Sequence, residues 1–340
     1  MADIDVVIVG AGLAGLVAAR ELTAAGARVR LLDKGVGPGG RLATHRIDDA
    51  TLDHGAQFFT VRSDEFDDLV EHWRADGASV ERWSTGFAQA TDVRAGPPGV
   101  TSTAGDGHPR YVVTGGMETL AKTLARGLDV VVDTCVTAIW ARDGRWRVAA
   151  TGVQGMRTYD AAAVLCTAPV PQALALLDRG ATVLPPDAEA SLRALAYDPC
   201  LALLAVVDRD PELPTPGGVQ FAEGPVRWLA DNARKGVSAV PAVTLHAAGD
   251  WSATWYEAAD RVVGVTLYAW LAPWLGPASV RTWQVKRWRY SQPRNPADEH
   301  VVRTDVDELP IAFAGDAFGH ARVEGAARSG LAAAAALVRG

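Results

Sequence analysis

The stretch VVIVGAGLAG, residues 6–15, decides how the chain begins to fold. The apolar run Ile4–Val9 is typical of a strand that is buried on both faces of a sheet. A glycine-rich turn follows, and the apolar spacing of residues 16–25 then predicts a helix that a glycine ends. A second predicted β-strand, residues 28–32, stops at Asp33. This order predicts a β-α-β unit that opens an α/β domain.

The glycines of this turn follow the pattern GxGxxG, at Gly10, Gly12 and Gly15. The first permits the tight turn, the second lets the backbone approach a pyrophosphate, and the third lets the helix pack on the strand. Free amides at the helix N-terminus attract phosphate. Asp33 ends the second strand, where a carboxylate suits a ribose diol and disfavours a 2′-phosphate. The predicted dinucleotide contacts are Gly10, Ala11, Gly12, Leu13, Ala14, Gly15, Asp33 and Lys34. The pattern leaves FAD and NAD both open.

Two further segments favour a flavin over a nicotinamide cofactor. Residues 37–46, GPGGRLATHR, add a glycine pair and an arginine soon after Asp33. Near the C-terminus an apolar strand ends at Gly315 and Asp316, and this carboxylate can accept from a sugar-like hydroxyl such as the ribityl chain of FAD. The helix that begins near Arg322 would direct its amides toward an anionic acceptor, and reduced flavin carries negative charge at N1 and O2. A nicotinamide dehydrogenase has no need of this closing segment, so FAD is the expected cofactor.

Composition narrows the class of protein further. The 340 residues carry a net charge of −7 and no long basic run, so a nucleic-acid partner is not expected. The three cysteines are scattered, which predicts neither a disulfide framework nor a metal site. The N-terminus is acidic where a signal peptide would be basic, and the closing apolar stretch LAAAAALV is too short to span a bilayer. A cytoplasmic protein without membrane attachment is the expectation.

The segment TLDHGAQFFTVRS, residues 51–63, contains an acid and a histidine that resemble a catalytic dyad. Asp53 and His54 are sequence neighbours, however, and neighbours on a strand point to opposite faces. No third ligand or triad partner is visible in the sequence. The segment is therefore predicted to be a pocket wall beside the flavin, with Gly55 admitting close approach of the ring and Gln57 offering its amide. Which of the next two phenylalanines faces the flavin stays open.

Elsewhere the sequence predicts further strands and helices around this beginning. A long helix is expected over residues 257–274, with Val262, Val265, Trp270 and Trp274 facing inward. Residues 280–290 alternate like a strand.

Several motifs, taken together, resemble the renalase-like branch of the FAD-dependent amine oxidase superfamily. They are VVIVGAGLAGLVAARELTAAG, DKGVGPGGRLATHR, LDHGAQFFTVRS, VTGGMETLAKTL, LCTAPVPQALALL, KRWRYSQP and AFAGDAFGHARVEGAARSG, and they cover nearly the whole chain. The resemblance implies an α/β (α+β overall) fold. A Rossmann-like FAD-binding domain of the p-hydroxybenzoate hydroxylase type would be joined to a smaller substrate domain on a mixed or antiparallel sheet. The implied boundaries are 1–75, 108–170 and 285–340 for the FAD domain, and 76–107 and 171–284 for the substrate domain.

The resemblance also implies a reaction and a set of contacts. Renalase-like enzymes oxidise the 2- and 6-dihydro isomers of NAD(P)H with FAD, and O2 then accepts the electrons to give H2O2. Beyond the first turn, the implied FAD contacts are Gly40, Arg41, Ala56, Gln57, Phe58, Val136, Thr167, Gly315, Asp316, Arg322, Val323 and Glu324. No catalytic side chain is required, because loss of hydride alone makes the nicotinamide ring aromatic. FAD is expected to be noncovalent, the partners are the dihydronicotinamide dinucleotide and O2, and the chain would be a monomer or a homodimer.

The candidate substrate contacts are Phe59, Arg62, Trp228, Asn232, His246, Trp288 and Tyr290. For the tryptophans the alternative is core packing, for His246 a structural histidine, and for Arg62, Asn232 and Tyr290 a solvated surface. An ordinary amine oxidase is the second hypothesis. Many such relatives carry a lysine beneath the flavin, and the segment Tyr197–Val207 has none, although Lys286 lies on another strand. A non-catalytic flavin-binding redox sensor is a further alternative. A carotenoid-desaturase-like enzyme would need an apolar or basic entry surface that the sequence does not show.

Overall fold

The computed structural model describes residues 4–102, 105–153 and 155–338, which fall into two compact units. The first unit contains residues 4–40, 121–196 and 293–338, and the second contains residues 41–120 and 197–292. Both units are therefore assembled from segments that lie far apart in the sequence. The domain boundaries that the family resemblance implies stay a prediction.

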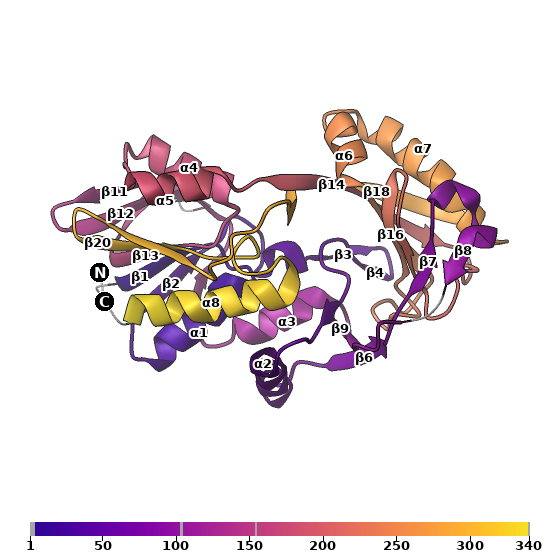
Figure 1. Cartoon of the computed structure of the whole chain (residues 1–340), viewed down its shortest axis with the longest axis horizontal. Coiled ribbons are helices and arrows are strands. Elements are labelled where there is room, and N and C mark those ends of the chain that lie inside the picture. Colours follow the sequence, from indigo (N-terminus) through magenta and orange to yellow (C-terminus); the bar gives the residue numbers. More distant parts are fainter. Residues whose placement is uncertain (1–3, 103–104, 154, 339–340) are drawn as a thin grey trace. The chain divides into compact units, whose positions relative to one another are not determined.

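The first unit is built on an eight-stranded sheet (Figure 1). Its main path has the order β10-β2-β1-β13-β12-β11, and β20 pairs with both β13 and β19. The strands are β1 (Ile4–Val9), β2 (Val29–Leu32), β10 (Asp129–Val131), β11 (Thr134–Arg142), β12 (Arg145–Gly152), β13 (Gly155–Cys166), β19 (Val302–Val306) and β20 (Leu309–Phe313). Strands β10, β2, β1, β13 and β20 pair in parallel, whereas β11, β12 and β19 join by antiparallel pairing. The predicted β-α-β beginning and the mixed α/β fold class are confirmed.

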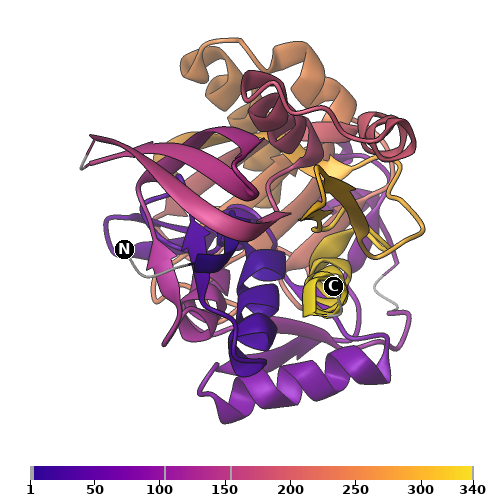
Figure 2. The same cartoon turned by 90° about the vertical axis from the view of Figure 1, so that its left-hand side faces the viewer.

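Helices cover both faces of this sheet, which explains the continuous apolar run of β1. They are α1 (Leu13–Ala24), α4 (Val170–Arg179), α5 (Pro186–Arg193) and α8 (Arg322–Val338). The sheet lies between α1 and α8 on one side and α4 and α5 on the other (Figures 1 and 2). Helix α8 packs closely along α1, because Gly330 has no side chain: a Cβ there would lie 2.5 Å from the carbonyl oxygen of Ala14. The middle of α8 is thereby held against the first turn of α1, the helix that follows the GxGxxG turn.

The second unit contains a seven-stranded sheet of order β18-β14-β17-β16-β15-β7-β8. These strands are β7 (Ala88–Ala90), β8 (Val100–Ser102), β14 (Tyr197–Val207), β15 (Gly218–Phe221), β16 (Val226–Asp231), β17 (Ala242–Ala247) and β18 (Val280–Pro293). Two small sheets, β3-β4 and β5-β9-β6, use β3 (Thr44–Ile47), β4 (Ala50–Asp53), β5 (Phe59–Thr60), β6 (Val80–Ser84) and β9 (Arg110–Val113). The helices are α2 (Asp64–Ala75), α6 (Gly249–Trp255) and α7 (Asp260–Leu271), while α3 (Met117–Leu124) crosses the boundary between the units in sequence.

One face of the seven-stranded sheet forms the main core of this unit. Alternate residues of β14 and β17, among them Leu203 and Leu245, pack with the buried side of α7. The helix expected over residues 257–274 is confirmed as α7, but its expected bounds are wrong. Helix α7 begins only at Asp260 and ends at Leu271, and Ala272–Trp274 form a 3₁₀ turn. Trp274 is buried and Trp270 packs on this core, as expected.

The orientation expected for the first part of that helix is also wrong. Val263 and Leu267 face the core, whereas Val262 is 44% exposed and Val265 53% exposed. The reason is the glycine of α7: a Cβ on Gly264 would lie 2.1 Å from the Trp283 ring, so the helix turns this side toward β18.

Candidate functional site

The predicted dinucleotide site lies at one edge of the first unit's sheet. Strands β1, β2, β13 and β20 are parallel, so their carboxyl ends share that edge. Gly10 follows β1, Asp33 follows β2, Thr167 follows β13 and Gly315 comes soon after β20. Ligands of open α/β sheets bind outside the carboxyl ends of the strands. The fold thus brings together, from three distant segments, residues that the sequence associated with FAD.

The glycines of the turn have distinct geometric roles. Gly10 has φ +107°, a left-handed conformation that favours glycine, and a Cβ on Gly15 would lie 2.2 Å from the carbonyl oxygen of Gly10. A Cβ on Gly12, in contrast, would meet no protein atom within 4 Å. Close packing therefore requires the first and third glycines, while the second borders open space. This is the arrangement that a pyrophosphate needs in order to approach the backbone.

Asp33 is held in place by the backbone of the same turn. Its Oδ2 accepts a 2.6 Å hydrogen bond from the Ala11 amide, and its Oδ1 accepts one of 2.7 Å from the Gly35 amide. A carboxylate has about four lone-pair sites, so it keeps acceptor capacity for a ribose diol. Asp33 thus orients the turn as well as offering itself to a ligand, a second role that the sequence motif alone does not reveal.

The segment after β20 completes this edge. Gly315 has φ +143°, and its amide donates to the Ser329 hydroxyl on α8 at 2.9 Å. Asp316 is buried, and α8 begins at Arg322, whose φ is +90°. The other predicted contacts of this segment are Val323, which is buried, and Glu324, which is half-buried. The segment thus brings Gly315 beside Thr167, which itself donates to the GxGxxG turn, and it leads into the N-terminus of α8.

The remaining predicted cofactor contacts of the first unit are Gly40, Thr167, Lys34 and Val136. Gly40 has φ +53°, and Gly12 is the nearest residue to a Cβ built on it. Thr167 donates from its hydroxyl to the carbonyl oxygens of Val9 and Gly10, both at 3.0 Å. Lys34 is exposed beside Asp33, and Val136 is buried on β11.

In the second unit, a group of polar and aromatic side chains lies on the sheet face opposite α7, and we call it the imidazole face. It comprises His45, His54, Gln57, Trp228, His246, Lys286 and Trp288. Trp228 pairs with His246 across β16 and β17. The His54 ring stacks on Trp288 at 5.1 Å, and the Trp288 indole donates to the His54 carbonyl at 2.7 Å. Three predicted substrate contacts, Trp228, His246 and Trp288, are thus brought together around the HGAQ segment.

The acid of the apparent dyad has another partner. Asp53 is fully buried, and its Oδ2 lies 2.7 Å from Nζ of Lys235, whose side chain is also fully buried. Its Oδ1 accepts from the Thr44 hydroxyl at 2.6 Å and from the Met117 amide at 2.9 Å. Asp53 therefore anchors β4, and it forms no dyad with His54, as the alternation of strand residues predicted.

Lys235 is the buried polar residue beside the imidazole face that sequence reasoning missed. It lies in the turn after β16, and no local pattern distinguishes it from a surface lysine. The one signal is scarcity: the chain has four lysines among its 33 basic residues, so a lysine is unusual at any position.

The two phenylalanines of the DHGAQFF segment point to different surroundings. Phe58 is half-buried and packs with Trp83, Phe87 and Trp228, with ring centroids 4.7 Å from Phe87 and 5.3 Å from Trp228. Phe59 is buried among Phe66, Trp73 and Tyr111. Phe58 is therefore the phenylalanine beside the imidazole face.

Gly55 is needed for a contact that the sequence did not indicate. A Cβ there would lie 2.1 Å from the carbonyl oxygen of Arg41, and the next amide, that of Ala56, donates to the same oxygen at 2.8 Å. The side chain of Arg41 donates to the carbonyl oxygens of Tyr290 and Ser291. Gly55 thus allows its own backbone to pack against that of Arg41, a contact between two protein segments.

Burial keeps the histidines of this face neutral. It lowers the pKa of His54 to about 3, with the positive charge of Lys286 as the next cause. It lowers the pKa of His246 to about 4, with the charge of Lys235 contributing. Burial and Lys286 also lower the pKa of His45. At neutral pH these rings are therefore uncharged. The charge of Lys235 is balanced by Asp53, whereas Lys286 places an ammonium beside His45 and His54.

Four predicted substrate contacts lie outside the imidazole face or at its margin. Phe59 is in the core described above, and Arg62 is exposed with an ion pair to Asp106 at 3.5 Å. Asn232 is fully buried, where its amide donates to the Thr244 hydroxyl at 2.9 Å and helps to hold β4 on the sheet. Tyr290 is half-buried, edge-on to Tyr197 at 5.7 Å.

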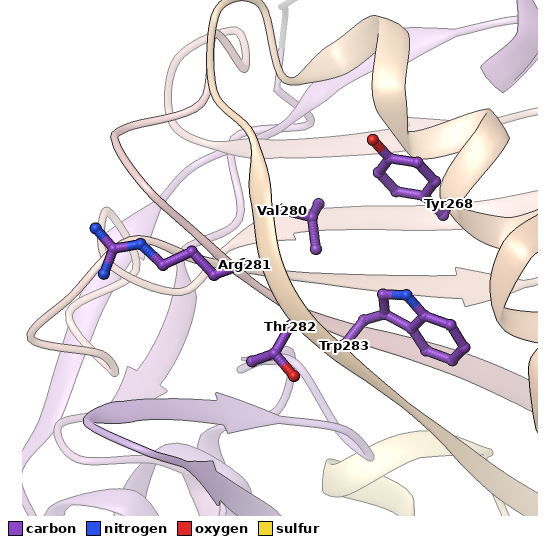
Figure 3. A pocket seen from close by; sticks show the side chains of 5 residues that line it. All are labelled: Tyr268, Val280, Arg281, Thr282 and Trp283. Atoms are coloured by element: carbon purple, nitrogen blue, oxygen red, sulfur yellow. The ribbon is translucent and has the colours of Figure 1, made fainter.

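A separate cavity of about 440 Å³ lies at the beginning of β18. It is lined by Tyr268, Val280, Arg281, Thr282 and Trp283. Tyr268 and Trp283 face one another on the α7 side, while Arg281 extends away from them (Figure 3). None of these residues was predicted to bind FAD or substrate.

Two family models together match nearly the whole chain. A model of NAD(P)-binding Rossmann-like domains matches residues 8–73, and a model of flavin containing amine oxidoreductases matches residues 71–338. The chain is 45% identical over 76 residues to hydroxyneurosporene desaturase of Rubrivivax gelatinosus and 45% identical over 67 residues to putrescine oxidase of Kocuria rosea. These matches span 22% and 20% of this chain, and only 14% of each relative.

Solved structures share the fold over the whole chain. A triple mutant of putrescine oxidase has a TM-score of 0.72 at 17% identity, with 99% of both chains covered. A putative protoporphyrinogen oxidase from Exiguobacterium sp. 255-15 has a TM-score of 0.73 at 16% identity, covering 100% of this chain and 99% of the other. Cyclohexylamine oxidase from Brevibacterium oxydans has a TM-score of 0.71 at 15% identity, with 99% of both chains covered.

The fold and the dinucleotide edge define a flavin-dependent oxidoreductase. The chain belongs to the family of flavin containing amine oxidoreductases, whose model covers most of it. FAD is its cofactor, as expected from the sequence. Within the described ranges, no helix is both long enough and apolar enough to cross a membrane.

Proposed function

We propose that the protein is an FAD-dependent oxidase that takes hydride from the 2- or 6-dihydro isomers of NAD(P)H, as in the renalase-like branch of its family. The observation that carries this proposal is the charge of the imidazole face. Its histidines are neutral, and Asp53, the carboxylate that adjoins it, is paired with Lys235. The charge of Lys235 is balanced by Asp53, so the ammonium of Lys286 supplies the net positive charge beside the neutral rings.

This charge suits an anionic dinucleotide better than an amine. An amine such as a diamine enters as a cation, and like charges disfavour its approach unless a carboxylate is present. The phosphates of a dinucleotide are attracted by the same field. The comparison with amine-oxidising relatives favours amine oxidation, so a small amine is retained as the second candidate.

Oxidation of a dihydronicotinamide requires little of the protein, and the imidazole face offers what it requires. Loss of hydride turns the ring into an aromatic pyridinium, and no substrate proton has to move. Bound FAD supplies a two-electron acceptor that O2 can reoxidise, with H2O2 as product. The protein residues need only stack and orient the substrate ring and exclude water. Phe58, Trp228 and Trp288 offer aromatic surface for this.

Two polar atoms of the imidazole face are available for a ligand. Nε1 of Trp228 and Nδ1 of His54 are buried without a hydrogen-bond partner among the described residues. Buried polar groups are normally paired, so each of them marks a place where a ligand or a water molecule would bind. A dinucleotide carries carbonyl, amide and hydroxyl groups that match both.

The proposed FAD contacts are the residues of the first unit's sheet edge together with Arg41, Ala56, Gln57 and Phe58. FAD is proposed to be noncovalent, and release of all flavin from the denatured chain is the expected result. A flavin that stays on the denatured chain contradicts it.

Anaerobic mixing with a panel of reductants tests the proposed reaction. We expect rapid loss of oxidised flavin absorbance with 2- or 6-dihydro-NAD or their NADP forms, and little change with putrescine, cyclohexylamine or benzylamine. Bleaching by an amine alone would establish the second candidate. Bleaching by no reductant would favour a flavin-binding sensor.

A further inference from the structure

Lys286 is a half-buried lysine of the imidazole face whose ammonium has no ion pair within the part of the chain that the structure describes. It lies on β18 with Gln284 and Trp288, and because alternate residues of a strand share a face, Arg287 points to the other side. Asp260 acts on the Lys286 ammonium, but its carboxylate forms an ion pair with Arg287. A positive charge without a counter-charge is therefore left on the face proposed to bind substrate.

The hydrogen bonds around Lys286 are one partner short. Its Nζ lies 3.1 Å from Nε2 of His45, and Oε1 of Gln284 lies 3.0 Å from the same nitrogen. A neutral imidazole nitrogen carries either a proton or a lone pair, so Nε2 can donate to Gln284 or accept from Lys286 but cannot do both. If it donates, the ammonium has no acceptor among the described residues, and if it accepts, the Gln284 oxygen loses its donor. An anionic oxygen at the ammonium removes this conflict, because a hydrogen bond between two charged groups is stronger than one between neutral groups.

The surroundings of this ammonium indicate what kind of molecule carries the anion. Lys286 and Trp288 are two residues apart on one face of β18, which places them about 7 Å apart along the strand. Trp288 stacks on His54 with ring centroids 5.1 Å apart. The His54 ring stands edge-on to His45, the ring that Lys286 contacts, at 6.1 Å. A ligand on this face thus meets aromatic surface at one end and an ammonium at the other, and a nicotinamide nucleotide has this form, with a flat ring, a ribose and then a phosphate.

We propose that Lys286 binds the phosphate that follows the nicotinamide ribose of the substrate, and that it thereby determines the preference for a dinucleotide over an amine. This inference rests on the proposed function and deepens it by naming the residue that recognises the phosphate. The ammonium attracts the phosphate, whereas the same charge repels the cation of an amine. No bond or proton changes at Lys286, so its effect falls on substrate binding and not on the rate of hydride transfer once the substrate is bound.

Binding of nicotinamide mononucleotide and of nicotinamide riboside to the FAD-loaded protein tests the assignment, because the two ligands differ only by the phosphate. The change that each ligand causes in the flavin absorbance spectrum gives its dissociation constant without turnover. We expect the mononucleotide to bind about tenfold more tightly than the riboside, and this preference to shrink to about twofold or less in Lys286→Met, since a charge-assisted hydrogen bond contributes about this much. Lys286→Arg keeps the charge and should retain most of the preference.

Arg281→Met is the matched control, because Arg281 is exposed on the same strand, lies outside the imidazole face and removes the same charge when replaced. This variant should keep the full preference for the mononucleotide. The assignment of Lys286 is refuted if the unsubstituted protein shows no such preference, if neither ligand binds, or if Lys286→Met keeps the preference.

Anaerobic flavin reduction by 6-dihydro-NAD separates failure of this assignment from failure of the proposed function. In Lys286→Met we expect the half-saturating concentration to rise about tenfold while the limiting rate stays nearly unchanged. An unchanged half-saturating concentration overturns the role of Lys286 and leaves the proposed reaction standing. Absence of flavin reduction by both dihydronicotinamide isomers in the unsubstituted protein overturns the proposed function itself, and with it the assignment.

Discussion

The buried ion pair between Asp53 and Lys235 makes a quantitative prediction about stability. Replacing Lys235 by Met keeps the length and apolar stem of the side chain but leaves the Asp53 carboxylate buried without its counter-charge. Breaking a buried pair in this way costs about 3–5 kcal/mol. Because Asp53 keeps its hydrogen bonds from Thr44 and Met117, we expect a loss near the lower end, about 3 kcal/mol.

The double variant Asp53→Asn/Lys235→Met separates the charge effect from the loss of packing. The asparagine side chain that replaces Asp53 would still accept from Thr44, and its amide would offer a donor to the Gln57 oxygen that Lys235 leaves. Since neutral replacement of a buried pair is often without net cost, we expect the double variant to be more stable than Lys235→Met, by about 2 kcal/mol.

Urea denaturation followed by tryptophan fluorescence measures these differences as shifts of the midpoint at constant slope. Lys286→Met is the control, because Lys286 is half-buried and donates to neutral His45, so its loss should cost less than about 1 kcal/mol. The reasoning is refuted if Lys235→Met costs no more than this control, or if the double variant is no more stable than Lys235→Met.

Three further predictions follow from the same contacts. Gly15→Ala should abolish retention of FAD, because its Cβ would lie 2.2 Å from the Gly10 carbonyl oxygen; a variant that purifies with a full flavin content contradicts this. In the folded chain the pKa values of His54 and His246 are about 3 and about 4, so below pH 6.5 these histidines take up protons in the unfolded chain but not in the folded one. The free energy of unfolding should therefore decrease as the pH is lowered, by up to about 1.4 kcal/mol per pH unit for each histidine. In the variant His54→Gln/His246→Gln the urea midpoint should depend less on pH between pH 6 and 5. Trp288→Phe keeps the stack on His54 but removes the 2.7 Å hydrogen bond to its carbonyl, so KM should rise several-fold with little loss of flavin; an unchanged KM removes Trp288 from the substrate site.

The beginning of the fold is predictable because its signals are local. The apolar run of β1 and the glycines of the turn that follows each reflect a constraint within a few residues, and Gly15 is required by the Gly10 carbonyl five residues away.

Side chains that meet across long sequence separations are not predictable in this way. Lys235 lies 182 residues from Asp53 in the sequence, and no pattern in the residues around it predicts that its side chain is buried. Asn232 has the polarity of a surface or substrate contact, yet it is used to hold β4 on the sheet. On α7, apolar periodicity suggested that Val265 faces inward, whereas the position of Gly264 against Trp283 decides the orientation.

The most direct test of the proposed hydride transfer is the single-turnover rate of flavin reduction without oxygen, measured between pH 6 and 9. With 6-dihydro-NAD or 2-dihydro-NAD we predict fast reduction by at least one isomer, at a rate that is nearly constant across this range, since the histidines are neutral throughout and no substrate proton moves. Benzylamine and putrescine, measured in parallel, should reduce the flavin no faster than free FAD is reduced in solution. Fast reduction by an amine, with a rate that rises with pH as the amine loses its proton, and no reduction by either dihydronicotinamide, would contradict the proposal.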